Sequence, residues 1–284
     1  MSLRYRVCQL FDRPGGRAVL GWAATRFYRK ISGRDVSIFW DGSWFSRDGS
    51  EYVSDGMRFN YTERGLLKKK LRRDRAIEDS RDYWFYRYKP KSEDVIIDIG
   101  AGSGKDLGLF SKSVGSKGVV VAVEAHPRTF ERLRKTSEYN KFKNVVLRHC
   151  AVTEKRGKVS IEDTLNDEEN AISLTQNQSD ILVDSITIDE LCSEAGIDRV
   201  NFLKMNIEGA EQSAILGMKE IIKHTDFATI ACHDFRAIAV NDHRFRTREI
   251  VSTFLVENGF SVEIRSDDTR PYVQDHVHAW RRTH

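Results

Sequence analysis

Residues 94–104 read DVIIDIGAGSG, an apolar run that ends in three glycines spaced two apart. The apolar run predicts a buried strand. Glycine has no side chain, so a ligand beside this turn would lie against bare backbone. At the end of the first strand of an open α/β sheet, the helix that follows also offers unpaired N–H groups and a positive dipole end. The stretch therefore predicts a nucleotide-like ligand.

From Lys91 onward, apolar runs alternate with amphipathic segments, as in a parallel sheet built from βα units. We predict strands over 94–99, 118–124, 144–150, 200–206 and 227–232, and helices over 105–113, 127–139, 208–224 and 246–258. Two further strands, FSVEIR and HVHAWRR, follow them. Five βα units and a terminal pair are common in methyltransferases. The prediction is an α/β fold with a Rossmann-like, mostly parallel sheet of seven strands.

The first part of the chain has a different texture. We predict an N-terminal accessory region over residues 1–90 and a cofactor-binding domain over 91–284. Apolar residues at helical spacing predict a helix over 17–30. Asp-Gly pairs begin at Asp41, Asp48 and Asp55, with aromatic runs between them. Because Asp-Gly suits type I′ turns, we predict a four-stranded β-meander whose aromatic side is either its core or a recognition surface.

Composition excludes little. The 284 residues include 46 Lys and Arg and 42 Asp and Glu, and a net charge of +4 permits anionic partners without requiring nucleic acid or a membrane. The basic run over 64–75 predicts a solvated helix, with weak membrane-surface contact as the alternative. The four cysteines form no CxxC pair, and charges interrupt the first 30 residues. We therefore expect a cytoplasmic location and no signal or transmembrane segment.

Details of the glycine turn separate two classes of nucleotide. A dinucleotide fingerprint needs a third glycine at position 105, which is Lys105. The GxGxG pattern is complete, with Gly100, Gly102 and Gly104. Asp98 would repel a diphosphate but could orient an ammonium group. Glu124 closes the second strand, where a carboxylate can accept both hydroxyls of a ribose. These features favour S-adenosylmethionine, with another nucleotide as the alternative.

Four ordered blocks over about residues 92–225 resemble those of the FkbM-family methyltransferases. They are Asp98-Ile-Gly-Ala-Gly-Ser-Gly104, Val121-Ala-Val-Glu-Ala-His-Pro127, Thr187-Ile-Asp-Glu-Leu191 and Leu203-Lys-Met-Asn-Ile-Glu-Gly-Ala-Glu211. The resemblance implies a class I fold and transfer of a methyl group from S-adenosylmethionine to an oxygen, often on a sugar, glycolipid or natural product. It also implies that Ala101, in the turn, contacts the cofactor and that Ala151 and Val152 border the adenine.

One position departs from the family pattern: Asn206 stands where the family usually has Asp. In the resembling fold this strand end faces the methyl group. An amide can exchange hydrogen bonds with the cofactor or the acceptor there, but it cannot act as a base. This departure leaves a non-catalytic module that binds S-adenosylmethionine as one alternative function.

A base should help a weakly nucleophilic hydroxyl by about 10²- to 10⁴-fold. His233, after the fifth strand, is the preferred candidate because histidine titrates near neutrality. Glu208, after the fourth strand, is the second. His276 and His278 share one face of the last strand and should approach His233. We predict no metal there, although a site built from the three histidines with Asp234 or Asp275 is an alternative.

The sequence as a whole predicts an S-adenosylmethionine-dependent O-methyltransferase with a small-molecule or glycan acceptor. An RNA methyltransferase that binds RNA through residues 64–75 and the aromatic sheet is an alternative, which the modest charge weakens. The polar stretch over 166–179 is interpreted as an exposed connection, with a lid over the site as the alternative. The oligomeric state does not follow from the sequence.

Overall fold

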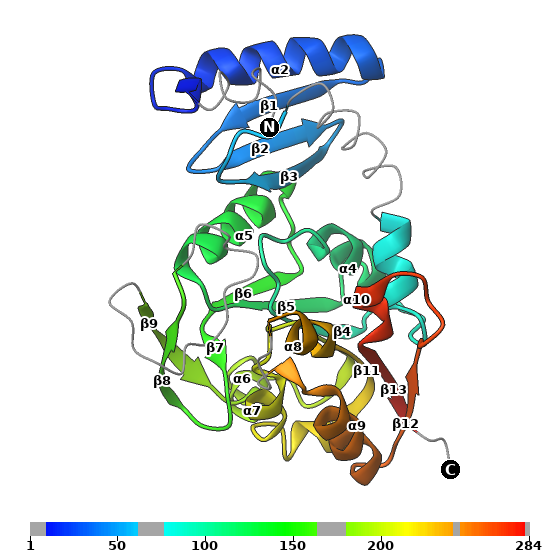
Figure 1. Ribbon diagram of the computed structural model, residues 1–284. Coiled ribbons are helices and arrows are strands. Elements are labelled where there is room, and N and C mark those ends of the chain that lie inside the picture. The colour runs from blue at the N-terminus through cyan, green and yellow to red at the C-terminus, as the bar shows by residue number, and fades with distance from the viewer. Residues whose placement is uncertain (1–9, 62–76, 164–179, 241–244, 282–284) are drawn as a thin grey trace.

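The computed structural model describes residues 10–61, 77–163, 180–240 and 245–281 (Figure 1). A helix and a small sheet, drawn in blue, lie on top of a larger body built around a central sheet. The predicted basic helix over 64–75 and the predicted connection or lid over 166–179 lie outside the described residues. None of the described helices combines the length and apolarity needed to cross a bilayer.

The central sheet contains seven strands in the described residues, in the order β12-β13-β11-β10-β4-β5-β6. They are β4 (Val95–Ile99), β5 (Val119–Glu124), β6 (Val145–His149), β10 (Val200–Met205), β11 (Thr225–Ala231), β12 (Phe260–Ile264) and β13 (His276–Arg281). β13 runs antiparallel to β11 and β12, and the other neighbours are parallel. This confirms the predicted Rossmann-like class I methyltransferase fold, and every predicted strand of this sheet lies within two residues of its observed bounds.

Helices cover both faces of this sheet, and the strands are buried between them. They are α4 (Leu107–Val114), α5 (Pro127–Asn140), α6 (Ile188–Glu194), α7 (Glu211–Ile215), η1 (Ile221–His224), α8 (Asp234–Val240), α9 (Arg248–Glu257) and α10 (Pro271–Gln274). Along β4, Ile96 packs in one core cluster with Phe110, while Ile97 packs in another with Leu255. Because both faces are buried, β4 reads as a continuous apolar run and not as an alternating one.

The predicted helix over 208–224 is wrong in part, because the chain forms α7 and η1 there instead. Gly217, between them, lies so close to the carbonyl oxygen of Thr153 that an added Cβ would be 2.3 Å from it. The carboxylate of Asp189, on α6, accepts the backbone N–H groups that begin η1. Contacts with other parts of the chain thus replace the hydrogen bonds of a continuous helix.

The polar stretch after β6 forms a separate three-stranded sheet beside the central one. Its strands are β7 (Ala151–Val152), β8 (Gly157–Ile161) and β9 (Ile181–Ile186), in the order β7-β9-β8. β7 runs parallel to β9, and β8 runs antiparallel to β9. The sheet therefore holds Ala151 and Val152 next to the carboxyl end of β6.

The described N-terminal part is a helix on a three-stranded antiparallel sheet. Its elements are α2 (Arg17–Ser32), β1 (Val36–Trp40), β2 (Trp44–Asp48) and β3 (Glu51–Gly56). Gly42 and Gly49 have φ values of 70° and 62° in the turns between the strands. The helix predicted over 17–30 and the turns at the first two Asp-Gly pairs are therefore confirmed.

The fourth strand predicted after the third Asp-Gly pair is wrong. Phe59 donates its backbone N–H to the carboxylate of Asp12 at 2.7 Å, so it does not pair with β3. The rings of Phe59 and Tyr61 pack edge-on against Trp44, in the core beneath α2. Burial of these two rings takes the place of strand pairing.

The aromatic side chains of the small sheet belong to its packing. Trp44 and Phe45 are fully buried. On the face away from α2, Phe45 and Tyr52 pack against the ring of Tyr139 on α5, and Asn140 of α5 exchanges hydrogen bonds with the backbone of Tyr52. The core interpretation is thus confirmed for these rings, and α5 joins the small sheet to the central one.

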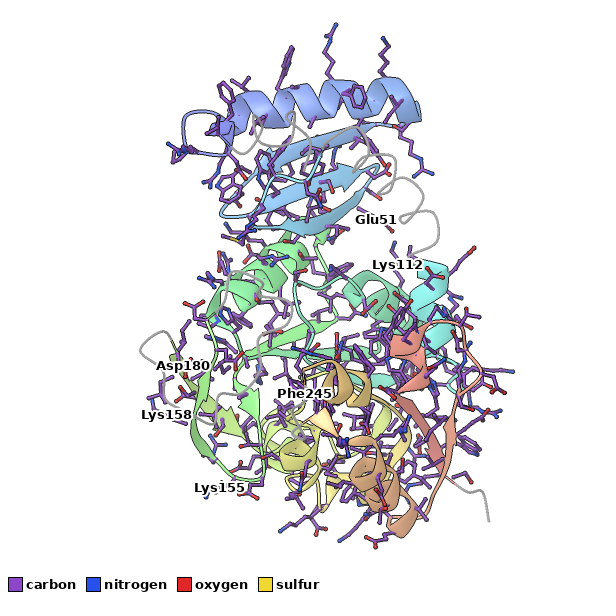
Figure 2. All side chains as sticks on the ribbon, viewed as in Figure 1. Glu51, Lys112, Lys155, Lys158, Asp180 and Phe245 are labelled. Carbon is purple, nitrogen blue, oxygen red and sulfur yellow. The ribbon has the colours of Figure 1, made fainter. Side chains whose placement is uncertain are left out.

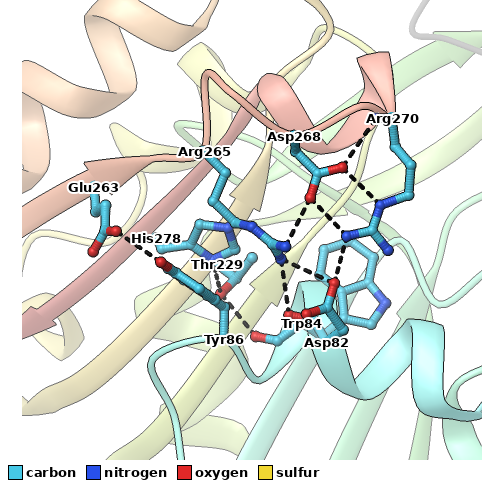
Figure 3. Close-up of polar contacts among 9 residues, drawn as sticks. All are labelled: Asp82, Trp84, Tyr86, Thr229, Glu263, Arg265, Asp268, Arg270 and His278. Carbon is cyan, nitrogen blue, oxygen red and sulfur yellow. Dashed lines mark hydrogen bonds and ion pairs between the residues drawn. The ribbon is translucent and has the colours of Figure 1, made fainter.

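Residues 77–88 cross the edge of the central sheet near β12 and β13. Asp82 bonds Arg265 and Arg270 of the connection that follows β12 (Figure 3). The carbonyl oxygen of Trp84 accepts a hydrogen bond of 2.9 Å from Thr229 on β11. These residues therefore pack with the central sheet, and the division of the chain at residue 90 stays a prediction.

Truncation of Phe202 on β10 tests how much this packing contributes to the free energy of unfolding. Its side chain is fully buried and stacks on Tyr88 with ring centroids 4.6 Å apart. We expect Phe202→Ala to lower the free energy of unfolding by about 3–5 kcal/mol. Urea unfolding measures the change. Phe11→Ala, at a side chain that is 55% exposed, should cost less than about 0.5 kcal/mol. Equal stability of the two variants would contradict the packing.

Candidate active site

A cavity lies at the carboxyl ends of β4, β5 and β10, the edge at which parallel sheets of this kind bind ligands. Eight of the residues predicted from the sequence line it: Gly100, Ala101, Gly102, Glu124, Ala151, Val152, Asn206 and Glu208. Asp98, Gly104 and His233 are not among the described residues that line it. The chain order reverses at β4, between β10 and β5, which opens the space above the sheet.

The three glycines of the turn have different surroundings. A Cβ added to Gly100 would lie 1.9 Å from the carbonyl oxygen of Asn206, so a side chain at residue 100 would push β4 and β10 apart. Gly102 has a φ of 57°, and a Cβ there would meet no atom within 4 Å. Gly104 faces away from the cavity and packs against Leu133 and Thr136 of α5. The bare surface available to a ligand is therefore at Gly102.

Glu124, at the end of β5, holds the glycine turn in place. One carboxylate oxygen accepts the N–H of Gly102 at 2.9 Å, and the other accepts the N–H of His126 at 2.8 Å. Burial raises the pKa of Glu124, and the N–H donors oppose that shift. Each carboxylate oxygen has a second lone pair, so the side chain that shapes the turn can also accept hydroxyl groups of a ligand.

Asp98 pairs with Lys204 of β10 beneath the cavity. The Oδ1 of Asp98 and the Nζ of Lys204 are 2.7 Å apart, and both side chains are buried. The same ammonium group donates to the carbonyl oxygen of Gly100 at 2.7 Å. An ammonium group of the protein thus lies against one oxygen of this carboxylate, and the role of Asp98 in orienting the ammonium group of a ligand, directly or through water, stays a prediction.

Asn206 lines the cavity and carries a buried side-chain oxygen. Its backbone N–H donates to the carbonyl oxygen of Ile99 at 2.9 Å, which fixes the end of β10. Its side-chain Oδ1 is buried and has no hydrogen-bond partner among the described residues. A buried carbonyl oxygen without a donor costs free energy. A ligand that brings a donor to this oxygen would remove that cost.

Glu208 lines the cavity, and its carboxylate is held by two cationic side chains. Its backbone φ is 54°, a left-handed conformation that is strained for a residue with a side chain and is often found at functional sites. One oxygen lies 3.2 Å from the Nε2 of His233, and the other bonds the guanidinium of Arg236. Burial alone would raise the pKa of Glu208, but His233 and Arg236 lower it below the ordinary value. Glu208 is therefore an anion at neutral pH.

His233 lies behind Glu208 and is buried between two carboxylates. Its Nδ1 is 3.2 Å from an oxygen of Glu211, a side chain that is fully buried and also bonded by Thr247. Burial alone would lower the pKa of His233, but the hydrogen bonds to Glu208 and Glu211 raise it to about 9. At neutral pH the ring therefore keeps both protons. An imidazolium cannot accept a proton, so this geometry favours Glu208 over His233 as the base, and both assignments stay predictions.

The strand that carries His276 and His278 lies where the sequence predicts it, with His276 of β13 beside Ala231 at the end of β11. Both rings are buried. Burial lowers the pKa of His276 to about 3 and that of His278 to about 4, so both are neutral. In the part of the chain that the structure describes, no group of three histidine, cysteine or acidic side chains is arranged to hold a metal ion.

The sequence analysis assigned no role to two side chains of the site, Lys204 and Arg236. Lys204 is a single charge inside the buried strand VNFLKM, and a charge there needs a partner, so the strand pattern itself could have indicated an internal ion pair. Arg236 lies on α8 and follows no pattern that distinguishes it from other arginines. Only its contact with Glu208 assigns it to the site.

The raised pKa of His233 should make stability depend on pH. The charged ring is bound more tightly in the folded chain, so its stabilisation is complete below the unfolded pKa of about 6.5 and is lost as the pH rises through about 9. A shift of this size corresponds to about 3 kcal/mol at most. The free energy of unfolding should therefore decrease between pH 6 and pH 10, and urea unfolding measures this decrease. We expect the decrease to be smaller in His233→Gln, because the contribution of the charged ring is missing.

The matched control is His224→Gln, at an exposed histidine that ends η1. It should leave the pH profile of the unfolding free energy like that of the unmodified chain. A profile for His233→Gln that coincides with this control would show that the ring is not held as an imidazolium between Glu208 and Glu211.

The sequence is similar to a known protein family and to curated methyltransferases. The family model described as "Methyltransferase FkbM domain" matches residues 98–262. Over 154 residues the chain is 25% identical to the 2-O-methyltransferase NoeI of Sinorhizobium fredii. The aligned part covers 48% of this chain and 62% of NoeI. Over 143 residues the chain is 24% identical to the hexuronic acid methyltransferase AglP of Haloferax volcanii. The aligned part covers 50% of this chain and 57% of AglP.

The chain thus spans less than two thirds of the length of these curated relatives. Among solved structures, the methyltransferase FkbM from Methylobacillus flagellatus KT is 18% identical with a TM-score of 0.47, over 69% of this chain and 45% of that one. The family match spans more than half of the sequence and includes the glycine turn, Glu124, Asn206 and Glu208. This chain belongs to the FkbM methyltransferase domain family.

Proposed function

We propose that the chain transfers a methyl group from S-adenosylmethionine to a hydroxyl group of a sugar, with a sugar acid as the first acceptor to test. The observation that carries the proposal is the cavity that Glu208 lines together with Gly102 and Glu124. Family membership supports methyl transfer. The names of the two curated relatives, a 2-O-methyltransferase and a hexuronic acid methyltransferase, support an oxygen acceptor on a sugar.

The residues of the cavity fit the proposed cofactor. Gly102 leaves room for a nucleoside against the backbone, and Glu124 has lone pairs for the two ribose hydroxyl groups. Ala151 and Val152 offer apolar surface to an adenine ring, and Asn206 lines the same cavity. When bound, the cofactor supplies a methyl group that a positively charged sulfur has already activated.

In the proposed reaction Glu208 holds the acceptor hydroxyl. Its carboxylate accepts the hydrogen bond of the hydroxyl group and then the proton that the hydroxyl loses. Because His233 and Arg236 lower the pKa of Glu208, the carboxylate is a weak base, and its main contribution is orientation. Orientation of a reacting oxygen can supply several kcal/mol of a barrier. His233 and Arg236 are positioning residues that hold the carboxylate through its two oxygens.

The activity test uses labelled S-adenosylmethionine with a methyl glycoside of glucuronic acid, a methyl glucoside and a short RNA as acceptors. We expect label on the sugar acid. Glu208→Gln should lower kcat by about 10²-fold or more, because a neutral amide orients the acceptor hydroxyl less firmly than a carboxylate and cannot accept its proton. Its affinity for S-adenosylmethionine, measured by calorimetry, should stay nearly unchanged. Full activity of this variant would exclude the assignment of Glu208, and label on the RNA alone would replace the proposed acceptor.

Asn206 supplies the test of the non-catalytic alternative. An amide at this position can bind a ligand but cannot supply the carboxylate that the family usually has. If the unmodified chain binds S-adenosylmethionine and methylates no sugar, while Asn206→Asp gains activity, the chain is a binding module. Activity of the unmodified chain decides for the enzyme.

Glu124→Gln tests the cofactor site separately from the chemistry. The amide keeps one acceptor oxygen but places an NH2 group against a backbone N–H of the turn or against a ribose hydroxyl group. Hydrogen bonds to charged groups contribute about 1.5–3 kcal/mol each, so the Kd for S-adenosylmethionine should rise about 10-fold or more. Calorimetry measures the Kd. Glu257→Gln, at an exposed glutamate on α9, is the control and should bind as the unmodified chain does. An unchanged Kd for Glu124→Gln would remove Glu124 from the site.

A further inference from the structure

The outer side of α2 exposes large apolar side chains. Val19 is 63% exposed and Trp22 is 65% exposed, and Leu10 and Phe11, just before the helix, are 64% and 55% exposed. The opposite side of α2 packs on the small sheet. Figure 2 shows α2 at the edge of the molecule, with side chains that project away from the rest of the described chain. These four apolar side chains therefore contribute little to the core, although they are among the most exposed in the described residues.

Basic residues share this side of α2 with the apolar ones. Arg26 and Lys30 follow Trp22 at intervals of four residues, so all three lie along one stripe of the helix, and all are exposed. The guanidinium of Arg26 lies 5.9 Å from the ring centroid of Trp22. The sequence of α2, RAVLGWAATRFYRKIS, contains no Asp or Glu. The face of α2 defined by Val19, Trp22, Arg26 and Lys30 is thus apolar and cationic.

This pattern differs from that of an ordinary solvated helix. Helices that lie in the surface plane of a membrane combine Trp, Phe or Leu with Lys or Arg, because the apolar groups enter the headgroup layer while the cations bind anionic lipids. A second copy of the chain is a poorer occupant, since pairing two α2 faces would bring Arg26 and Lys30 near like charges. Charge complementarity therefore favours an anionic bilayer.

We propose that this face of α2 docks the protein on the surface of a membrane that contains anionic lipids. Val19 and Trp22 enter the headgroup layer, and Arg26 and Lys30 bind the lipid phosphates. Arg29, at the edge of the face, is already paired with Asp35 and adds less. The docking is peripheral and reversible. It rests on α2 alone and does not depend on the proposed methyl transfer.

The test is sedimentation of the full chain with vesicles of phosphatidylcholine, with and without phosphatidylglycerol. We expect binding to the mixed vesicles that weakens steeply with salt, because screening shortens the reach of charges from about 10 Å at 0.1 M to about 3 Å at 1 M. Each basic residue near an anionic surface contributes about 1 kcal/mol, so Arg26→Glu with Lys30→Glu should lower the partition coefficient at least about 25-fold. Lys155→Glu with Lys158→Glu, far from α2 in Figure 2, should change it little.

The apolar contribution has its own matched pair of variants. Val19→Asp on α2 should lower the partition coefficient about 10-fold or more, because moving a carboxylate out of water costs free energy that a valine side chain does not cost. Val256→Asp on α9 changes a valine that is 50% exposed and should bind like the unmodified chain. Circular dichroism checks that both variants fold, and each changes a side chain outside the core.

Several outcomes would overturn the proposal. They are absence of binding to the mixed vesicles, equal binding to neutral ones, or equal losses in the α2 variants and their controls. Light scattering that shows a dimer, dissociated by Val19→Asp and without affinity for vesicles, would assign the face to a second copy of the chain.

Discussion

The contact between β4 and β10 beneath the cavity sets the geometry of the whole site. Gly100 allows the two backbones to touch at Asn206, and the ammonium group of Lys204 bridges the Asp98 carboxylate and the Gly100 carbonyl oxygen. A charge buried without its partner would cost several kcal/mol, so the pair holds these two strands in one register. With that register, the turn after β4 and the end of β10 face each other across the cavity.

A second set of charges determines what the cavity offers chemically. Glu211 and Glu208 share the protons of His233, and Arg236 completes the neutralisation of Glu208. The carboxylate of Glu208 is therefore held by two cations, which keep it ionised and limit its basicity. This suits a reaction in which the methyl donor is already activated and the main requirement is the placement of an oxygen.

The N-terminal part and the cavity are connected through α5. This helix begins beside the turn that Glu124 holds and ends against the small sheet, where Tyr139 and Asn140 contact Tyr52. The small sheet uses its aromatic rings for this packing and for the core beneath α2, so it offers little free aromatic surface. The outer face of α2 lies on the other side of the small sheet from α5 (Figure 1).

The sequence by itself determined the strands of the central sheet, the glycine turn, the place of Glu124 at the end of β5 and the family, because apolar runs, turn residues and motif spacing are local properties of the chain. It could not determine the fourth strand or the unbroken helix after β10, since burial of Phe59 and the contacts of Gly217 come from distant segments. It also could not show that Asp98 pairs with Lys204, or that His233 lies between Glu208 and Glu211. Those properties depend on which charges the folded chain brings within about 3 Å of each other in a dry interior, and periodicity carries no record of such distances.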